Sequence, residues 1–146
     1  MARRRSVITA FLDSSVLFTA INSPFGGSAK LFTLPKLKLL VSSVVLTEVE
    51  RNVRNKLTKL HLQRFFTLIN QLQIITQSPD AKSIQAAQKV IVSKDAVILA
   101  EVKRVRPQYL VTLDQKHFLQ PTVAEFIEPT IIVTPKMMIL HIRIGS

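Results

Sequence analysis

The most informative absence in this 146-residue sequence is cysteine, which does not occur at all. Without a thiol, the protein has no cysteine nucleophile, no disulfide framework and no thiolate metal site. The absence does not define a cellular compartment, and a cytoplasmic location is the default expectation for an ordinary enzyme. Any metal site in this chain has to be built without thiolates.

Long hydrophobic runs are also missing. A helix that crosses a bilayer needs about 20 consecutive apolar residues, and the hydrophobic stretch at 130–142 is interrupted by Pro135 and Lys136. Near the start, the apolar segment after the arginines is broken by Asp13, so we do not interpret it as a secretory signal. No clear basic amphipathic helix indicates binding to an anionic membrane surface. We therefore expect no membrane association.

Acidic residues are scarce, with nine Asp and Glu against 20 Lys and Arg, which gives a net charge of +11. A field of that sign attracts polyanions, so nucleic acid is the first partner to consider. A basic surface without a specific partner is the alternative. The basic residues cluster at 3–5, 51–56 and 103–106. Because none of these is a long uniform block, they indicate patches on a folded surface.

The length and the 47% hydrophobic content predict a single domain over residues 1–146. We expect a basic N-terminal extension at 1–6 and a C-terminal tail at 135–146 that can form a final helix. The expected buried strands cover 7–12, 37–41, 73–76, 109–112 and 130–134. The expected helices cover 14–22, 28–34, 44–57, 59–71, 79–92 and 93–105. This alternation predicts an α/β protein, a three-layer α/β/α sandwich with a mainly parallel sheet.

Four of the nine acids stand out by position. Asp13 and Asp114 each follow an expected strand, and the functional crevice of an open parallel sheet lies beyond the carboxyl ends of its strands. A helix cap or turn is the alternative role for both. Glu48 lies beside the apolar stripe of its helix. Asp95 shares a helix face with apolar side chains, although a first-turn acid also stabilises the helix dipole.

Three of the remaining acids have simpler interpretations. Glu50 and Glu101 are expected to form surface pairs with Arg54 and Arg104, and Asp80 is expected to start a helix. If the four selected acids come together, they repel, by about 4 kcal/mol for two charges ~4 Å apart at a dielectric of 20. A hard divalent ion, Mg²⁺ or Mn²⁺, resolves this repulsion. In a basic protein, this combination points to phosphodiester hydrolysis.

Four segments resemble the PIN-domain ribonuclease family. The segments FLDSSVLFTAI, VVLTEVERNV, KDAVILAEV and YLVTLDQKHF carry Asp13, Glu48, Asp95 and Asp114 at the places of the family's four acids. The segment SPFGGSAKLF is similar to the VapC-type subgroup of toxins from toxin–antitoxin pairs. The match covers about residues 8–134. The sequence departs from the family at Ser14 and Ser15, where Asn and a small residue are common, and at Leu113, where many members have Gly.

The resemblance implies metal-dependent cleavage of RNA by a metal-activated water. It implies that Asp13, Glu48 and Asp95 hold the main ion, and that Asp114 completes the cluster or positions a second ion or a water. The basic residues near these acids are expected to contact the RNA backbone; they are Arg51, Arg54, Lys56 and Lys116. RNA is the expected substrate, with DNA as an alternative, and a protein antitoxin and a second copy of the chain are expected partners.

Several interpretations stay open at this point. Thr112 can orient a carboxylate or be an ordinary β-branched strand residue. His117 can touch substrate, although a surface-loop histidine is the preferred interpretation. A catalytically inactive PIN-like RNA-binding or scaffold protein is an alternative function, disfavoured because all four acids are retained. A phosphoacceptor receiver-like domain is a further alternative, disfavoured because Asp13 stands alone after its strand.

Overall fold

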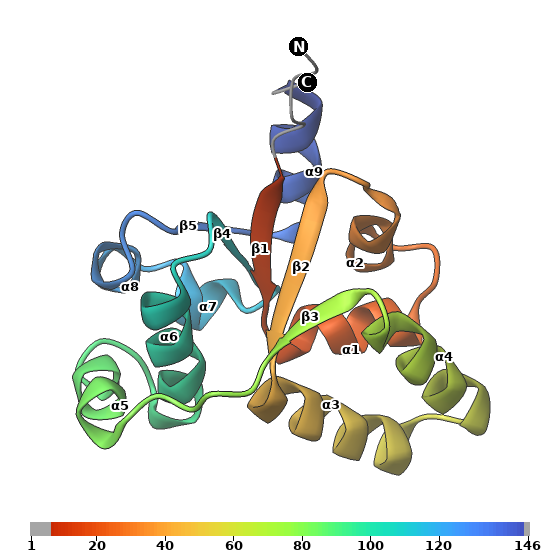
Figure 1. Cartoon of the computed structure of the whole chain (residues 1–146), viewed down its shortest axis with the longest axis horizontal. Helices are drawn as coiled ribbons and strands as arrows, with labels where there is room; N and C mark the ends of the chain where they lie inside the picture. Colours follow the sequence, from red (N-terminus) through yellow and green to blue (C-terminus); the bar gives the residue numbers. More distant parts are fainter. Residues whose placement is uncertain (1–6, 145–146) are drawn as a thin grey trace.

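A five-stranded sheet with only parallel pairings lies at the centre of the computed structural model, which describes residues 7–144 (Figure 1). The predicted basic extension at 1–6 lies outside the described residues. The spatial order of the strands is β3-β2-β1-β4-β5. Their bounds are β1 (Ile8–Leu12), β2 (Leu37–Ser42), β3 (Leu72–Ile75), β4 (Tyr109–Val111) and β5 (Ile131–Val133). The predicted fold class and the five predicted strands are confirmed.

Helices connect the strands and cover both faces of the sheet. Their bounds are α1 (Ser14–Asn22), α2 (Gly27–Lys30), α3 (Ser43–Lys56), α4 (Lys59–Ile69), α5 (Ala81–Gln88), α6 (Ser93–Val105), α7 (Gln115–Phe118), α8 (Pro121–Phe126) and α9 (Pro135–Ile144), with a 3₁₀ turn, η1 (Leu31–Thr33). The helix predicted at 28–34 is therefore split into α2 and η1. The sequence analysis assigned no helix to α8, which begins with a proline at its first turn, a position where proline is favoured.

Alternating side chains of the strands build a separate core on each face. In β1, Phe11 belongs to the larger core, whereas Ala10 and Leu12 belong to the smaller one. Helices α3, α4, α5 and α6 contribute to the larger core. On the other face, Met138 of α9 is fully buried in the smaller core. The expected C-terminal helix is thus part of the folded domain.

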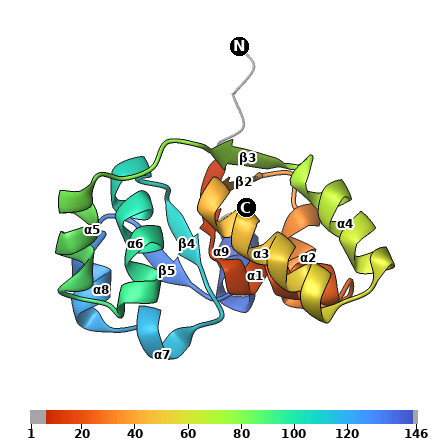
Figure 2. The same ribbon diagram turned by 90° about the horizontal axis from the view of Figure 1, so that it is seen from below.

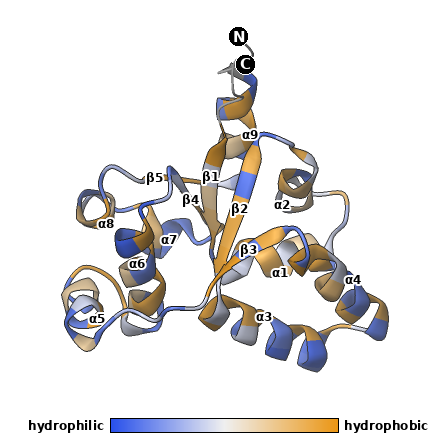
Figure 3. Ribbon diagram, viewed as in Figure 1, coloured by the Kyte–Doolittle hydropathy of each residue, from blue (hydrophilic) through white to orange (hydrophobic). Residues whose placement is uncertain are grey.

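Figure 3 shows β1 and β2 as mostly hydrophobic, while the later turns of α3 are hydrophilic. This pattern fits strands that are covered on both faces. In α3, Val45, Val49 and Val53 form the buried stripe, which leaves the charged side chains of the same helix toward solvent. Within residues 7–144, no helix has the length and apolar character needed to cross a membrane.

The strand order reverses between β1 and β4, which lie side by side at the centre of the sheet. After β1 the chain adds β2 and β3 on one side, and β4 and β5 follow on the other. Such a switch point leaves a crevice beyond the carboxyl ends of the two central strands. Figure 2 views the molecule from this end of β1 and β2, with α1, α3, α6 and α7 around it.

Candidate functional site

The four predicted acids line one cavity at this end of the sheet. The cavity has a volume of about 250 Å³ and is lined by Asp13, Ser14, Ser15, Phe18, Glu48, Asn52, Lys94, Asp95 and Asp114. Asp13 and Asp114 follow β1 and β4, while Glu48 and Asp95 come from α3 and the first turn of α6. Residues more than 100 positions apart in the sequence therefore meet at one site.

Asp13 is a helix cap, one of the two interpretations in the sequence analysis, and it also lines the cavity beyond β1. It is the N-cap of α1, with Oδ1 accepting hydrogen bonds from the Val16 N–H at 3.3 Å and from Ser15 Oγ at 2.5 Å. Its Oδ2 accepts a hydrogen bond from Thr112 Oγ1 at 2.5 Å. Only 3% of Asp13 is exposed. Burial raises the pKa of its carboxyl group, and the hydrogen bonds from Ser15, Thr112 and Val16 oppose that rise.

Two hydroxyl groups tie Asp13 to the chain after β4. Thr112 Oγ1 donates to Asp13 and accepts from the Asp114 N–H at 3.0 Å. Ser15 Oγ donates to Asp13 and accepts from the Leu113 N–H at 3.1 Å. Thr112 therefore orients a carboxylate, which is one of the two interpretations that the sequence left open. Ser15, at one of the departures from the family pattern, supplies a hydroxyl group that joins α1 to the segment after β4.

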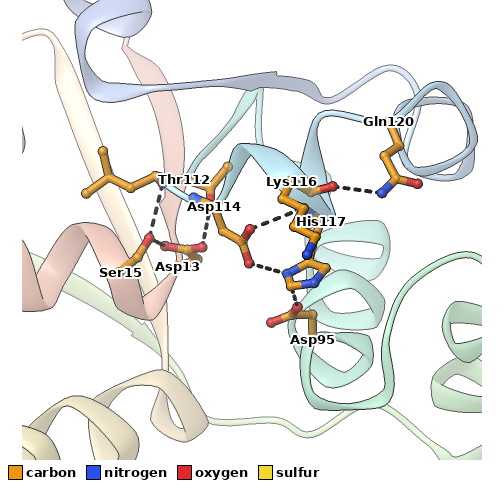
Figure 4. Close-up of polar contacts among 9 residues, drawn as sticks. Asp13, Ser15, Asp95, Thr112, Asp114, Lys116, His117 and Gln120 are labelled. Atoms are coloured by element: carbon orange, nitrogen blue, oxygen red, sulfur yellow. Dashed lines mark hydrogen bonds and ion pairs between the residues drawn. The ribbon is translucent and has the colours of Figure 1, made fainter.

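Asp114 is held by His117, as Figure 4 shows. Oδ1 of Asp114 accepts from the His117 N–H at 3.2 Å, and Oδ2 lies 2.7 Å from His117 Nδ1. Burial raises the pKa of Asp114, but the hydrogen bonds and charge of His117, together with the charge of Lys94, outweigh it and leave the pKa below its usual value. Because an ionised carboxylate only accepts hydrogen bonds, His117 Nδ1 is the donor in this pair.

Asp95 is the acid whose hydrogen bonding is least complete. Its Oδ2 is buried without a hydrogen-bond partner among the described residues, and it lies 3.8 Å from His117 Nδ1. Burial raises the pKa of Asp95, and the negative charges of Asp114 and Asp13 add to the rise, while Lys94 and His117 act against it. A buried carboxylate oxygen that has no hydrogen bond and lies near other acids is an arrangement that a cation stabilises.

The donor set at this point fits a metal ion. One ligand atom from each of Asp95, Asp114 and His117 can be chosen so that all three lie within 4.8 Å of one another. Sequence reasoning selected the two carboxylates but not the histidine. The signal for His117 was its position three residues after Asp114, which places its ring over the helix cap.

Glu48 and the predicted basic residues occupy different places around this cluster. Glu48 is exposed and faces the acid cavity from α3. Arg51 lines a neighbouring cavity together with Glu48. Arg54 is turned toward Glu50, as predicted, with 3.0 Å between Arg54 Nε and Glu50 Oε2. The other two predicted substrate contacts, Lys56 and Lys116, are exposed at the end of α3 and on α7.

The predicted surface pair between Glu101 and Arg104 is wrong. Glu101 is 1% exposed, and the side chain of Arg104 instead donates hydrogen bonds to the carbonyl groups of Ser78, at 2.8 Å, and Gln77. Most of the neighbouring positions in α6 are buried as well, so this part of the helix has little solvent-facing surface. Burial raises the pKa of Glu101, and a hydrogen bond with the Ser42 side chain and the charge of Arg104 oppose that rise.

No family model matches the chain, and no curated protein matches it by sequence. Solved structures do share its fold. PAE2754 from Pyrobaculum aerophilum is 10% identical with a TM-score of 0.62, over 94% of this chain and 97% of that chain. VapBC2 from Rickettsia felis, solved with a DNA fragment from its promoter, is 20% identical with a TM-score of 0.63, over 87% and 98%.

VapC20 from Mycobacterium tuberculosis, described as a sarcin–ricin loop cleaving toxin, is 14% identical with a TM-score of 0.52. The match covers 69% of this chain and 86% of that chain. At these identities the likeness shows the fold. The chain has the PIN-like α/β/α fold of VapC-type proteins, as its resemblance to that family predicts.

Proposed function

We propose that this chain, which shares its fold with VapC-type toxins, is a metal-dependent endoribonuclease and the toxin of a toxin–antitoxin pair. The observation that carries the proposal is the buried Oδ2 of Asp95, which has no hydrogen-bond partner among the described residues and lies beside Asp13 and Asp114. These acids line one cavity with Glu48 in a chain of net charge +11. The structural likeness to an RNA-cleaving toxin supports RNA as the substrate.

In this proposal Asp13, Glu48 and Asp95 hold the main ion, and Asp114 completes the cluster. Mg²⁺ and Mn²⁺ are the preferred ions because carboxylate oxygens are their usual protein ligands. When bound, such an ion neutralises charge on the scissile phosphate and lowers the pKa of a water.

The surrounding side chains keep the acids in place. Thr112 and Ser15 fix the orientation of Asp13 through their hydrogen bonds to its two oxygens. His117 donates its Nδ1 proton to Asp114, which orients that carboxylate, and its ring can also supply a ligand atom beside Asp95 and Asp114. An RNA strand drawn to the basic surface thus meets a pre-organised acidic cavity.

The wider context of the activity is also proposed. An antitoxin partner is supported by the VapBC2 complex, whose fold this chain shares. A second copy of the chain, DNA as an alternative substrate and a cytoplasmic location complete the proposal. Arg54, Lys56 and Lys116 are retained as contacts with the RNA backbone, since such contacts extend well beyond the reacting phosphate.

A cleavage assay tests the proposal. Labelled single-stranded RNA is incubated with the parent, Asp13→Asn, Asp95→Asn and the control Glu125→Gln, in which an exposed acid on α8 is replaced. We expect cleavage with Mg²⁺ or Mn²⁺ by the parent and the control, and a loss of about 100-fold or more in the two Asp variants. Equal cleavage by Asp13→Asn would exclude its catalytic role. RNA binding by the parent without cleavage in either metal would support the inactive RNA-binding alternative.

A further inference from the structure

A second, larger cavity adjoins the acid cavity and has no role in the chemistry described so far. It has a volume of about 600 Å³ and is lined by Ser43, Val44, Thr47, Glu48, Arg51 and Lys94. It shares Glu48 and Lys94 with the acid cavity. Its volume lies within the range of about 300–1,000 Å³ that is typical of ligand sites. The two cavities therefore lie next to each other at Glu48 and Lys94.

The charged groups of this cavity favour an anion. Arg51 and Lys94 are both exposed, and among residues 7–144 neither takes part in a salt bridge. Among the residues that the structure describes, Glu48 is the only carboxylate that lines this cavity beside the two cationic side chains. Lys94 also lines the acid cavity with Asp13, Asp95 and Asp114. Arg51 is thus available to an external anion, while the charge of Lys94 is shared with Asp95 and Asp114. A phosphate is the anion that RNA supplies at every nucleotide.

Two helices begin at this cavity and add to its positive potential. Ser43 and Val44 are the first residues of α3, and Lys94 is the second residue of α6. The N-terminus of a helix carries a partial positive charge and free N–H groups, which favour phosphate binding. The N-cap of α6 is Val92, which makes no side-chain capping hydrogen bond. The helix ends thus reinforce the two cationic side chains at the same place.

The polar groups of the cavity recognise charge and not bases. Ser43 Oγ donates to the Ile75 carbonyl group at 3.3 Å, and Thr47 Oγ1 donates to the Ser43 carbonyl group at 2.9 Å. With both hydroxyl protons in use, the side-chain donors left for a ligand are those of Arg51 and Lys94. Among residues 7–144, no Asn or Gln side chain lines the cavity, so it lacks the amide groups that read adenine edges.

We propose that this cavity binds an RNA phosphate adjacent to the scissile one, through Arg51 and Lys94, independently of base sequence. The inference rests on the proposed function for the position of the scissile phosphate. Lys94 is the positioning residue that connects the two cavities, because it lines both. Val44, which is 41% exposed, offers an apolar surface for the ribose of the same nucleotide.

Salt-dependent binding tests the inference without requiring cleavage. The affinity of labelled oligo-uridine and oligo-adenosine is measured by fluorescence anisotropy in EDTA between about 0.1 and 1 M salt. Each phosphate contact contributes about 0.7 to the slope of log affinity against log salt for single strands. We expect Arg51→Gln and Lys94→Gln each to reduce the slope by about 0.7, which is about fivefold in affinity over this tenfold salt range. In the double variant we expect the slope to decrease by about 1.4.

Lys38→Gln is the matched control. Lys38 is exposed near the start of β2, about 13 Å along the strand from the Ser42 cap of α3. This variant loses the same charge and is expected to keep the parental slope. Thermal melts that match the parent show that all four variants are folded.

The outcomes separate this inference from the proposed nuclease activity. Parental slopes in Arg51→Gln and Lys94→Gln would overturn the phosphate site even if the parent cleaves RNA. A greater loss with one oligonucleotide than with the other would overturn its independence of base sequence. Reduced slopes in a protein that cleaves no RNA with Mg²⁺ or Mn²⁺ would support the phosphate site and reject the nuclease.

Discussion

At the scale of single residues, Asp95 and Asp114 differ in how well their charges are stabilised. Burial and neighbouring acids raise the pKa of Asp95, whereas the hydrogen bonds of His117 outweigh burial and lower the pKa of Asp114. Oδ2 of Asp95 has no hydrogen-bond partner among the described residues, while Oδ2 of Asp114 lies 2.7 Å from His117 Nδ1. Without a metal ion, the charge on Asp95 therefore lowers the stability of the fold, whereas the charge on Asp114 contributes to it.

This difference predicts opposite effects of the same substitution. In EDTA at pH 7, Asp95→Asn should increase the free energy of unfolding, by about 0.5 kcal/mol and at most about 2 kcal/mol, because solvent screens part of the charge. Asp114→Asn should decrease it, because the charged hydrogen bond with His117 is lost. Urea denaturation of both variants measures the two values. A change of the same sign in both variants would contradict this account.

Sequence reasoning at the residue scale selects the acids better than their neighbours. Asp13 and Asp114 could be selected because strand ends are visible as apolar runs followed by polar residues. From the sequence, Thr112 was one of two open interpretations and Ser15 had no assigned role, since both roles depend on hydrogen bonds that connect two distant segments. Lys94 was also missed, because its importance comes from the junction of two cavities.

At the scale of elements, α6 joins the candidate metal centre to a buried acid one and a half turns further on. Asp95 lies in its first turn, and Glu101 is buried deeper in the same helix, with Oε1 unpaired among the described residues. A hydrogen bond links Glu101 to Ser42, the N-cap of the helix that carries Glu48. A buried acid therefore lies between the two helices that supply acids to the cavity.

The raised pKa of Glu101 predicts how stability depends on pH. Because burial raises its pKa, the Glu101 carboxyl group of the folded protein stays protonated at pH values just above its ordinary pKa of 4.5. Folding then binds a proton in that range, so this contribution to stability is complete below 4.5 and is lost as the pH rises through the folded pKa. Glu101→Gln cannot lose a proton. It should therefore gain stability over the parent as the pH rises, on the order of 1 kcal/mol at pH 7.

Thermal and urea denaturation from pH 4 to pH 8 measure this gain. Glu125→Gln, which replaces an exposed acid, should show no such dependence on pH. A difference between Glu101→Gln and the parent that stays constant with pH would show that the buried carboxyl group does not titrate in this range.

The bounds of the elements were predictable where local signals are strong. Helices α1 and α6 have the predicted residues, because a polar residue or a clear change in pattern precedes each of them. The four-residue α7 and six-residue α8 are too short for an amphipathic period to be recognised. The error at Glu101 has a different source, since the (i, i+3) pairing rule assumes a solvent-facing surface that α6 does not have there.

At the scale of the whole molecule, the site depends on strand order. The four acids meet because the chain turns back at β1 and β4, and no local pattern in the sequence specifies that order. The parallel α/β class was predictable from the alternation of strands and helices. The arrangement of charge was less predictable. The net charge indicated a polyanionic partner, but the cavity where two cations lie beside two helix N-termini could be recognised only in the folded structure.

The C-terminal helix connects global stability to this site. Met138 of α9 is fully buried in the smaller core, which also contains Leu12 and Val111, the last residues of β1 and β4. Met138→Ala should lower the free energy of unfolding by about 2–5 kcal/mol, since it leaves a cavity beneath the two strands that end at the acids. The adjacent Met137 is 38% exposed, so Met137→Ala should change stability by about 0.5 kcal/mol or less. Urea denaturation of this pair compares the same substitution at neighbouring positions. Equal effects would show that α9 is not part of the cooperative core.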